Sequence, residues 1–397
     1  MTVLGATMRI RPIAIMAVVA GSLLAGCGST TSAQQRPAHR GVQLSASSIP
    51  WDQVGSGWLL ATWNRNKGTA PGSHVAGNVA NPVNSIFLVD PAGGRYLIAR
   101  YTNENESLAG WSGDARRALL VDDVSPTRIS SIDLKTGLVS DSFALSTSNT
   151  VFFESVAYTR PGGLALLVTT QTNNAQLLQR YSLTGTLQHT YPASFSEVGA
   201  FGGSVLSSPD GLQLALGARG GIALLDNDGT LVSQVRVPGA TYCEVKRWWA
   251  TNVVLASCGG ASSTQRLFKV SLTGGTASAL TAPPRVTGPD EGDENAWAIG
   301  SSVYLQDAGG CGVQYLAQLQ PDHLTTPVAV PGVVRADSVF VLGTANGQLA
   351  LQATVACGSG ESALWFNPSK NTSTVVLGPP LNGGGVQVAL AYPDPIG

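Results

Sequence analysis

Short apolar runs separated by Gly, Pro, Asn and Asp recur along the chain, and this pattern predicts β-strands joined by tight turns. A helical fold is excluded, because no long stretch holds a 3.6-residue hydrophobic period free of Gly and Pro. One unit repeats: an apolar strand, a polar or Gly-containing turn, and a second strand. Its copies are SIFLVDPAGG, RISSIDLKTG, LLQRYSLTG, IALLDNDG, LFKVSLTGG, YLAQLQPDH and ALWFNPSKN.

The turns of these copies recur about every 46 residues, and a sustained period of roughly 40–50 residues is typical of a β-propeller. A second hairpin precedes each copy, as in SVLSSPDGLQLAL, so that two hairpins form one four-stranded blade. The sequence therefore predicts an all-β fold, a β-propeller with seven four-stranded blades. Six blades are the alternative.

The first unit is short of one strand, whereas an apolar strand at 385–392 (GVQVALAY) is left over at the other end of the chain. A propeller that stayed open would expose strand edges. We therefore expect the C-terminal strand to become the innermost strand of the first blade and to close the ring.

The N-terminal region has the features of a bacterial export signal. Residues 8–11 (MRIR) carry positive charge, residues 12–24 are apolar but too few to span a bilayer, and Leu24-Ala25-Gly26-Cys27 resembles a lipobox. The resemblance implies cleavage before Cys27 and diacylation of that residue, for example with palmitate. An ordinary signal peptide with a chance cysteine is the alternative.

These features give a domain plan. Residues 1–26 are the expected lipoprotein signal peptide, and residues 27–49 the lipidated Cys and a flexible polar tether. Residues 50–397 form a single propeller domain. Two acyl chains anchor a protein stably, so we expect a location on the extracytoplasmic face of the cell membrane, with the lipid as the sole membrane attachment.

Four cysteines remain in the mature chain, and four cysteines allow three disulfide connectivities. Cys243 and Cys258 lie at equal distances from a predicted hairpin turn at Ala250-Thr251, which places them opposite each other across two antiparallel strands. Cys311 and Cys357 are one repeat period apart. We predict the disulfides Cys243–Cys258 and Cys311–Cys357.

Composition narrows the function classes. Only 12% of residues are charged and the net charge is −1, so the chain has no basic surplus for nucleic acid. No zinc spacing, phosphate loop or hydrolase motif is present, and we expect neither catalysis nor a cofactor. The acidic turn with Asp290 and Asp293 is a weak calcium candidate, and a solvated turn is the favoured interpretation.

Carboxylates recur at one position of the inner hairpins. Counting back the same number of residues from the inner-hairpin turn of each unit from the second to the seventh gives Glu106, Glu154, Gly202, Glu244, Glu294 and Ser338, with Asp337 and Arg335 near the last. We expect this set at the channel mouth, where like charges raise one another's pKa values and attract a small cationic ligand. A solvated mouth without function is the alternative. The inner-strand tryptophans Trp111, Trp248, Trp249 and Trp297 are expected to pack between blades, and a sugar platform is the alternative for one of them.

The cysteine-containing segments CEVKRWWATNVVLASC, ENAWAIGSSVYLQDAGGCG and ACGSGESALWFNP resemble a group of exported TolB-like propeller lipoproteins from high-GC Gram-positive bacteria. The resemblance covers most of residues 50–392 and implies fold and location only, because that group has no established chemistry. We expect a monomeric binding module for a ligand or an envelope protein. An envelope enzyme and an assembly scaffold are the alternatives.

Overall fold

The strand signals of the sequence correspond to β-strands in the computed structural model. It describes residues 42–64, 84–102, 105–122, 124, 126–145, 151–172, 175–260, 265–283, 292–309, 313–334, 338–355, 361–378 and 384–393. These residues belong to one unit, Gln35–Gly397. Apart from the 3₁₀ turn η1 (Ala46–Ser48), every regular element in the described ranges is a strand. No helix in those ranges is long and apolar enough to span a membrane.

The described strands fall into seven antiparallel sets of four. The first set combines segments from both ends of the chain, and the next three follow in chain order. Set 1 contains β30 (Gly385–Ala391), β2 (Leu59–Asn64), β3 (Asn84–Val89) and β4 (Gly94–Tyr101); set 2 contains β5 (Glu106–Trp111), β6 (Arg117–Asp122), β7 (Arg128–Asp133) and β8 (Leu138–Ala144); set 3 contains β9 (Val151–Tyr158), β10 (Ala165–Thr172), β11 (Gln176–Ser182) and β12 (Leu187–Thr190); set 4 contains β14 (Gly199–Ser207), β15 (Gln213–Ala218), β16 (Gly221–Asp226) and β17 (Leu231–Arg236).

The last three sets continue the same order. Sets 5 and 6 are joined into one eight-stranded sheet by the single pair Gln265–Gly292. Set 5 contains β18 (Tyr242–Ala250), β19 (Val253–Gly259), β20 (Gln265–Ser271) and β21 (Thr276–Ala279); set 6 contains β22 (Gly292–Ile299), β23 (Ser302–Ala308), β24 (Gln314–Leu319) and β25 (Thr325–Pro327); set 7 contains β26 (Val339–Ala345), β27 (Gln348–Thr354), β28 (Glu361–Asn367) and β29 (Thr372–Leu377). The short strand β13 (Ser194–Phe195) pairs with β14.

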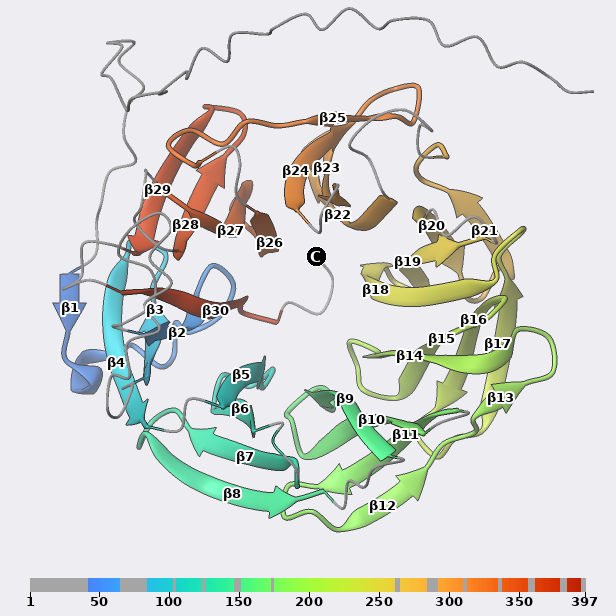
Figure 1. Cartoon of the computed structure of the whole chain (residues 1–397), viewed down its shortest axis with the longest axis horizontal. Coiled ribbons are helices and arrows are strands. Elements are labelled where there is room, and N and C mark those ends of the chain that lie inside the picture. The colour runs from blue at the N-terminus through green and yellow to red at the C-terminus, as the bar shows by residue number, and fades with distance from the viewer. Residues whose placement is uncertain are drawn as a thin grey trace, which may run out of the picture. The chain divides into compact units, whose positions relative to one another are not determined.

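The sets follow one another around a common centre, with the first strand of each set innermost (Figure 1). Second strands such as β15, and third strands such as β16, are buried almost throughout, which explains their continuous apolar sequences. Apolar clusters bridge neighbouring sets: Leu60 and Ile86 of set 1 pack with Leu108 and Trp111 of set 2. Several fourth strands face solvent, as β8 does at Leu138, which is 68% exposed, whereas β29 is largely buried. The predicted all-β propeller class is confirmed.

The C-terminal strand pairs where the sequence predicts it. β30 runs antiparallel to β2, from the pair Leu59–Ala391 to the pair Asn64–Gly385. It is the innermost strand of set 1 (Figure 1). The first and last described strands of the ring thus share one sheet.

Buried glutamines connect the second strand of one set to the first strand of the next. The Gln306 side chain donates to the carbonyl of Val339 (2.9 Å) and accepts from the amide of Val341 (2.7 Å). One repeat later, the Gln352 side chain donates to Gln387 O (3.0 Å) and accepts from Ala389 N (2.9 Å). The same pair of glutamine hydrogen bonds, called the clamp below, therefore holds two innermost strands. One is β26, inside the ring, and the other is the ring-closing strand β30.

Ordered structure begins earlier than the predicted domain boundary at residue 50. β1 (Val42–Leu44) pairs in parallel with β4, outside the four strands of set 1. Ile49 is buried in the apolar cluster shared by sets 1 and 2. Part of the predicted tether is therefore an edge strand, because a short exposed strand needs only backbone hydrogen bonds and leaves little apolar signal.

Candidate functional site

The innermost strands enclose a central cavity of about 400 Å³. Each of the seven first strands contributes to its wall, so the cavity lies on the axis of the ring. One wall residue from each strand is, in ring order, Trp111, Ala157, Ser207, Arg247, Trp297, Leu342 and Leu390.

Every innermost strand carries a β-bulge where it pairs with the second strand of its own set. These bulges determine which side chains reach the channel. In five sets a single residue is left without a cross-strand partner, in set 5 both Lys246 and Trp249 are, and in set 4 residues 202–204 face one residue of β15. A bulge reverses the alternation of side chains between the two faces of a strand. The single unpaired residues are Ala109, Glu154, Glu294, Leu342 and Gln387.

The bulge at Lys246 places two consecutive basic residues, Lys246 and Arg247, in the cavity wall. The Arg247 guanidinium lies over the Trp297 ring, 5.0 Å from its centroid, and donates to the carbonyl of Ala296 (3.3 Å). Trp248 points between the blades and donates through Nε1 to Ser207 O (2.8 Å). Neighbouring innermost strands are thus cross-linked by basic and aromatic side chains.

The tryptophans divide into two groups. Trp111, Trp248 and Trp297 are buried and line the cavity, so they pack between blades as expected and also form its wall. Trp249 is not among the lining residues; Lys269 stacks on its ring at 4.5 Å. Sugar stacking on any of them is untested.

The charge of the cavity wall is positive. Its described lining includes Arg160, Lys246 and Arg247 and contains no Asp or Glu. Lys246 forms an ion pair with Glu244, which lies outside the cavity lining, so this pair is close to neutral. The described lining thus holds the guanidinium groups of Arg160 and Arg247 and no carboxylate, a composition that favours an anion.

A second hollow adjoins the cavity, since Lys246 lines both. It brings together three of the equivalent positions named from the sequence: Glu154, Gly202 and Glu244. Glu154 accepts a hydrogen bond from Gln176 Nε2 (2.9 Å), and Glu244 accepts one from the Tyr242 hydroxyl (2.5 Å). Two carboxylates of the predicted set, Glu154 and Glu244, thus line this hollow, called the acidic hollow below, and both already have partners.

The pKa values of Glu244 and Glu106 are shifted in opposite directions. Burial acts to raise the pKa of Glu244, but Lys246 and the hydrogen bonds outweigh it and hold that pKa below its ordinary value. Burial, and then the charge of Asp122 on the facing strand, raise the pKa of Glu106. The expected mutual raising of pKa values is therefore wrong for Glu244, because its nearest charge is a lysine two residues along its own strand.

The two remaining described members of the predicted set, Glu106 and Glu294, lie elsewhere. Glu106 and Glu294 do not line the acidic hollow, and Glu294 accepts a hydrogen bond from Gln314 Nε2 (2.9 Å). Arg335 and Asp337 lie outside the described residues, next to Ser338, whose hydroxyl accepts from the amide of Gln314 (3.1 Å).

The calcium candidate is only half described. Asp290 lies outside the described residues; Asp293 is buried on β22, directly opposite buried Asp307 on β23. Among the residues that can be searched, no three His, Cys, Asp or Glu side chains are grouped as a metal site. The metal hypothesis stays a prediction.

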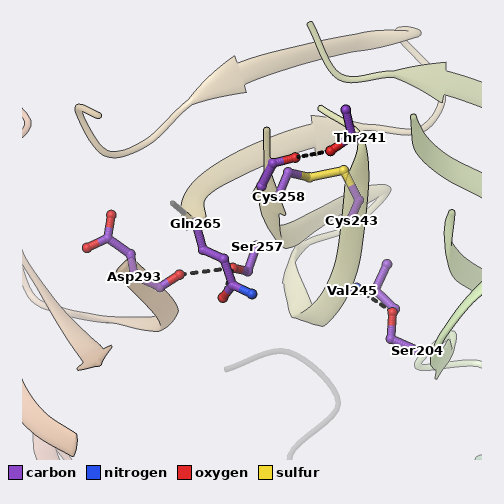
Figure 2. Close-up of a disulfide and its surroundings, with 9 residues drawn as sticks. Ser204, Thr241, Cys243, Val245, Ser257, Cys258, Gln265 and Asp293 are labelled. Carbon is purple, nitrogen blue, oxygen red and sulfur yellow. Dashed lines mark hydrogen bonds between the residues drawn. A yellow bond between two sulfur atoms is a disulfide. The ribbon is translucent and has the colours of Figure 1, made fainter. Parts of the chain in front are cut away.

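Cys243 and Cys258 form the predicted disulfide (Figure 2). They are paired residues of β18 and β19, at the end of the hairpin remote from its turn. The turn itself lies one residue later than predicted, at Thr251 and Asn252, where Asn252 has a φ of 59°. Two register shifts within the hairpin restore the predicted pairing at the cysteines. Cys27, Cys311 and Cys357 lie outside the described residues.

No family model and no curated protein matches this chain. Among solved structures, the propeller domain of the Trilobed protease from Pyrococcus furiosus has a TM-score of 0.51 at 10% identity, covering 86% of this chain and 97% of that one. A puromycin-hydrolyzing peptidase from Mycobacterium tuberculosis has a TM-score of 0.49 at 11% identity, covering 87% of this chain and 57% of that one. BamB from Moraxella catarrhalis has a TM-score of 0.44 at 14% identity, covering 68% and 91%. At these identities the likeness concerns the fold alone.

Proposed function

We propose that this protein is a lipid-anchored β-propeller of the cell envelope that binds a ligand, or a segment of a partner protein, in its central cavity. The observation that carries the proposal is the cavity wall, to which every innermost strand contributes. Pockets of about this size, with aromatic walls and a few placed polar groups, are typical small-molecule sites.

Binding is favoured over catalysis by the chemistry of the wall. The described lining combines guanidinium and indole groups, and it offers neither a histidine nor a carboxylate as a general base. In the acidic hollow, Glu154 and Glu244 are hydrogen-bonded to Gln176 and Tyr242, respectively. An envelope enzyme and an assembly scaffold remain the alternatives, and a small cation in the acidic hollow remains a prediction.

The location rests on the N-terminal sequence and on the resemblance to exported TolB-like lipoproteins of high-GC Gram-positive bacteria. Cys27→Ala removes the only acylation site that the lipobox resemblance implies, so the variant is expected in the soluble fraction. The measurement is membrane fractionation in high salt. Equal retention of the variant and the wild type on membranes would show that the anchor assignment is wrong.

The cavity itself is tested by site-directed photo-crosslinking. Ala157 is exposed and lines both hollows, so a photoreactive amino acid at this position samples a ligand in the channel. The matched control places the same group at Leu138, an exposed position on the outer strand β8. Irradiation in envelope extract, followed by mass spectrometry, is expected to trap a species from position 157 only. Trapping of the same species from both positions, or from position 138 alone, would refute binding in the cavity.

A further inference from the structure

We infer that the ligand of the central cavity carries an anionic group beside a flat apolar group, in the way that a carboxylate or a phosphate is attached to an aromatic ring. This inference rests on the proposed function and adds the chemical class of the ligand. It differs from the cationic ligand that the sequence predicts, because the two hollows of the channel differ in charge.

The anionic preference follows from the described wall residues. Arg160 is contributed by the end of the β9–β10 hairpin and Arg247 by β18, and no described lining residue carries negative charge. The carboxylates nearest to the lining along the chain are already engaged: Asp114, next to Gly113, accepts from the Ser112 hydroxyl (2.6 Å), Glu294, next to Asn295, accepts from Gln314 Nε2 (2.9 Å), and Glu244 pairs with Lys246. Guanidinium groups are effective partners of carboxylate and phosphate because they offer several donors in one plane.

The flat apolar group follows from the indoles. The Arg247 guanidinium lies over the Trp297 ring, which fixes its plane beside an apolar surface. Trp111 stands edge-on to Tyr392, with 5.3 Å between ring centroids, and both residues belong to the apolar cluster of sets 1 and 2. A ligand ring seated against either indole gains both apolar burial and aromatic contact.

A buried donor gives independent support. Trp111 lines the cavity and is 5% exposed, and its Nε1 has no hydrogen-bond partner among the described residues. Buried N–H groups are nearly always paired. An oxygen atom of a ligand seated against this indole would supply the missing acceptor.

The charge pattern also gives the ligand a direction. Glu154 and Glu244 line the hollow on one side of Lys246, whereas Gly113 and Arg160 line the cavity and belong to hairpin turns at the opposite ends of the innermost strands. An anion is repelled by Glu154 and Glu244 at the first end. At the second end Arg160 attracts it, and the carboxylates of the turns there, Asp114 and Asp210, are hydrogen-bonded to Ser112 and Ser208, respectively. The anionic group is therefore placed toward the turns that carry Gly113 and Arg160.

The test compares probes that share a ring and differ in charge. Indole-3-acetate, indole-3-acetamide and tryptamine are titrated by calorimetry onto the full mature protein. Phenylacetate and phenyl phosphate distinguish the carboxylate from the phosphate as the preferred anion. Indole-3-acetate is expected to bind at least tenfold more tightly than either other indole, since a hydrogen bond to a charged group is worth roughly a tenfold or greater change in affinity.

Three variants assign the effect to the cavity. Arg247→Gln is expected to weaken indole-3-acetate about tenfold and to leave indole-3-acetamide unchanged, whereas Arg247→Lys retains part of the affinity. Arg266→Gln is the matched control, because Arg266, on the third strand β20 and outside the cavity lining, also lies over an aromatic ring (Phe268, 5.4 Å) and donates to a carbonyl (Thr281 O, 2.7 Å). Arg160→Gln replaces Arg247→Gln if the latter fails to fold.

The outcomes separate this inference from the proposed function. Tighter binding of tryptamine than of indole-3-acetate would overturn the anionic class and leave a cavity that binds ligands. Binding of no probe at millimolar concentration would also overturn the inference, and the cross-linking from position 157 would still decide the proposed function. Equal losses in Arg247→Gln and Arg266→Gln would show that the anion binds elsewhere.

Discussion

Replacing Gln352 by leucine is expected to destabilise the propeller and to loosen its closing strand. Gln352 is 7% exposed, and its amide donates to Gln387 O (3.0 Å) and to the Glu361 carboxylate, while its oxygen accepts from Ala389 N (2.9 Å). Leucine preserves the apolar volume and removes all three hydrogen bonds. Two backbone groups of β30 then lose their side-chain partner.

The magnitude follows from those two backbone groups. A buried polar group left without a partner costs about 1–3 kcal/mol, so the variant is expected to lose about 3 kcal/mol of unfolding free energy. Gln306→Leu is the matched control, because Gln306 clamps β26 through the same pair of contacts inside the ring. Its loss of unfolding free energy is expected to be similar.

The two variants differ in where the structure loosens. β30 pairs with β2 alone, so its amides at residues 385–391 are expected to exchange hydrogen faster in Gln352→Leu and not in Gln306→Leu. Urea unfolding and peptide-resolved hydrogen exchange give the two readouts. A change below about 0.5 kcal/mol in Gln352→Leu, the ordinary range for surface substitutions, would refute the clamp as a contributor to ring closure. Unchanged exchange in β30 would refute its local role.

Two further perturbations concern the hairpin formed by β18 and β19. The double variant Cys243→Ala/Cys258→Ala is expected to lose about 3 kcal/mol of unfolding free energy, the chain-entropy value for a loop of about 15 residues; an unchanged urea midpoint would contradict it, and non-reducing peptide mapping of the wild type checks the predicted Cys311–Cys357 pair. Glu244→Gln is expected to be less stable than the wild type at pH 7. The folded pKa of Glu244 lies below its ordinary 4.5, so its stabilising effect is present above pH 4.5 and is lost as pH falls through the folded pKa. The stability difference between variant and wild type should therefore shrink on acidification, and a constant difference down to about pH 3 would contradict the ion pair with Lys246 as its cause.

The fold could be predicted because its signals repeat. Each blade presents the same two hairpins, so an uncertain strand in one unit is supported by its counterpart in the next. The turns at Ser112 and Ser208 show this directly: each hydroxyl donates to an Asp two residues later and accepts from the amide five residues later. The left-over strand at 385–391 could be placed for the same reason, since only the first unit was incomplete.

The site was less predictable because it depends on contacts between blades. Arg247 lies over Trp297, and nothing in either local sequence indicates that contact. The ion pair of Lys246 with Glu244 did have a signal, because residues two apart on a strand share a face. Applied to Glu244, that rule places a lysine beside the carboxylate and predicts a lowered pKa, which is the direction that the structure gives.

The bulges explain why equal positions in the repeat do not give equal environments. Counting back from each turn assumes that side chains alternate regularly along the innermost strand, whereas an unpaired residue inverts the alternation in every innermost strand except β14. In β9 and β22 the unpaired residue is the carboxylate itself, Glu154 and Glu294, respectively. In β18 the unpaired residue is Lys246, which follows Glu244 along the strand. Residues related by the repeat therefore reach different surroundings: Glu244 meets a lysine, and Glu294 meets the amide of Gln314. Because the bulge at Lys246 also brings Arg247 into the cavity wall, the same irregularity that divides the carboxylates gives the central cavity its positive charge.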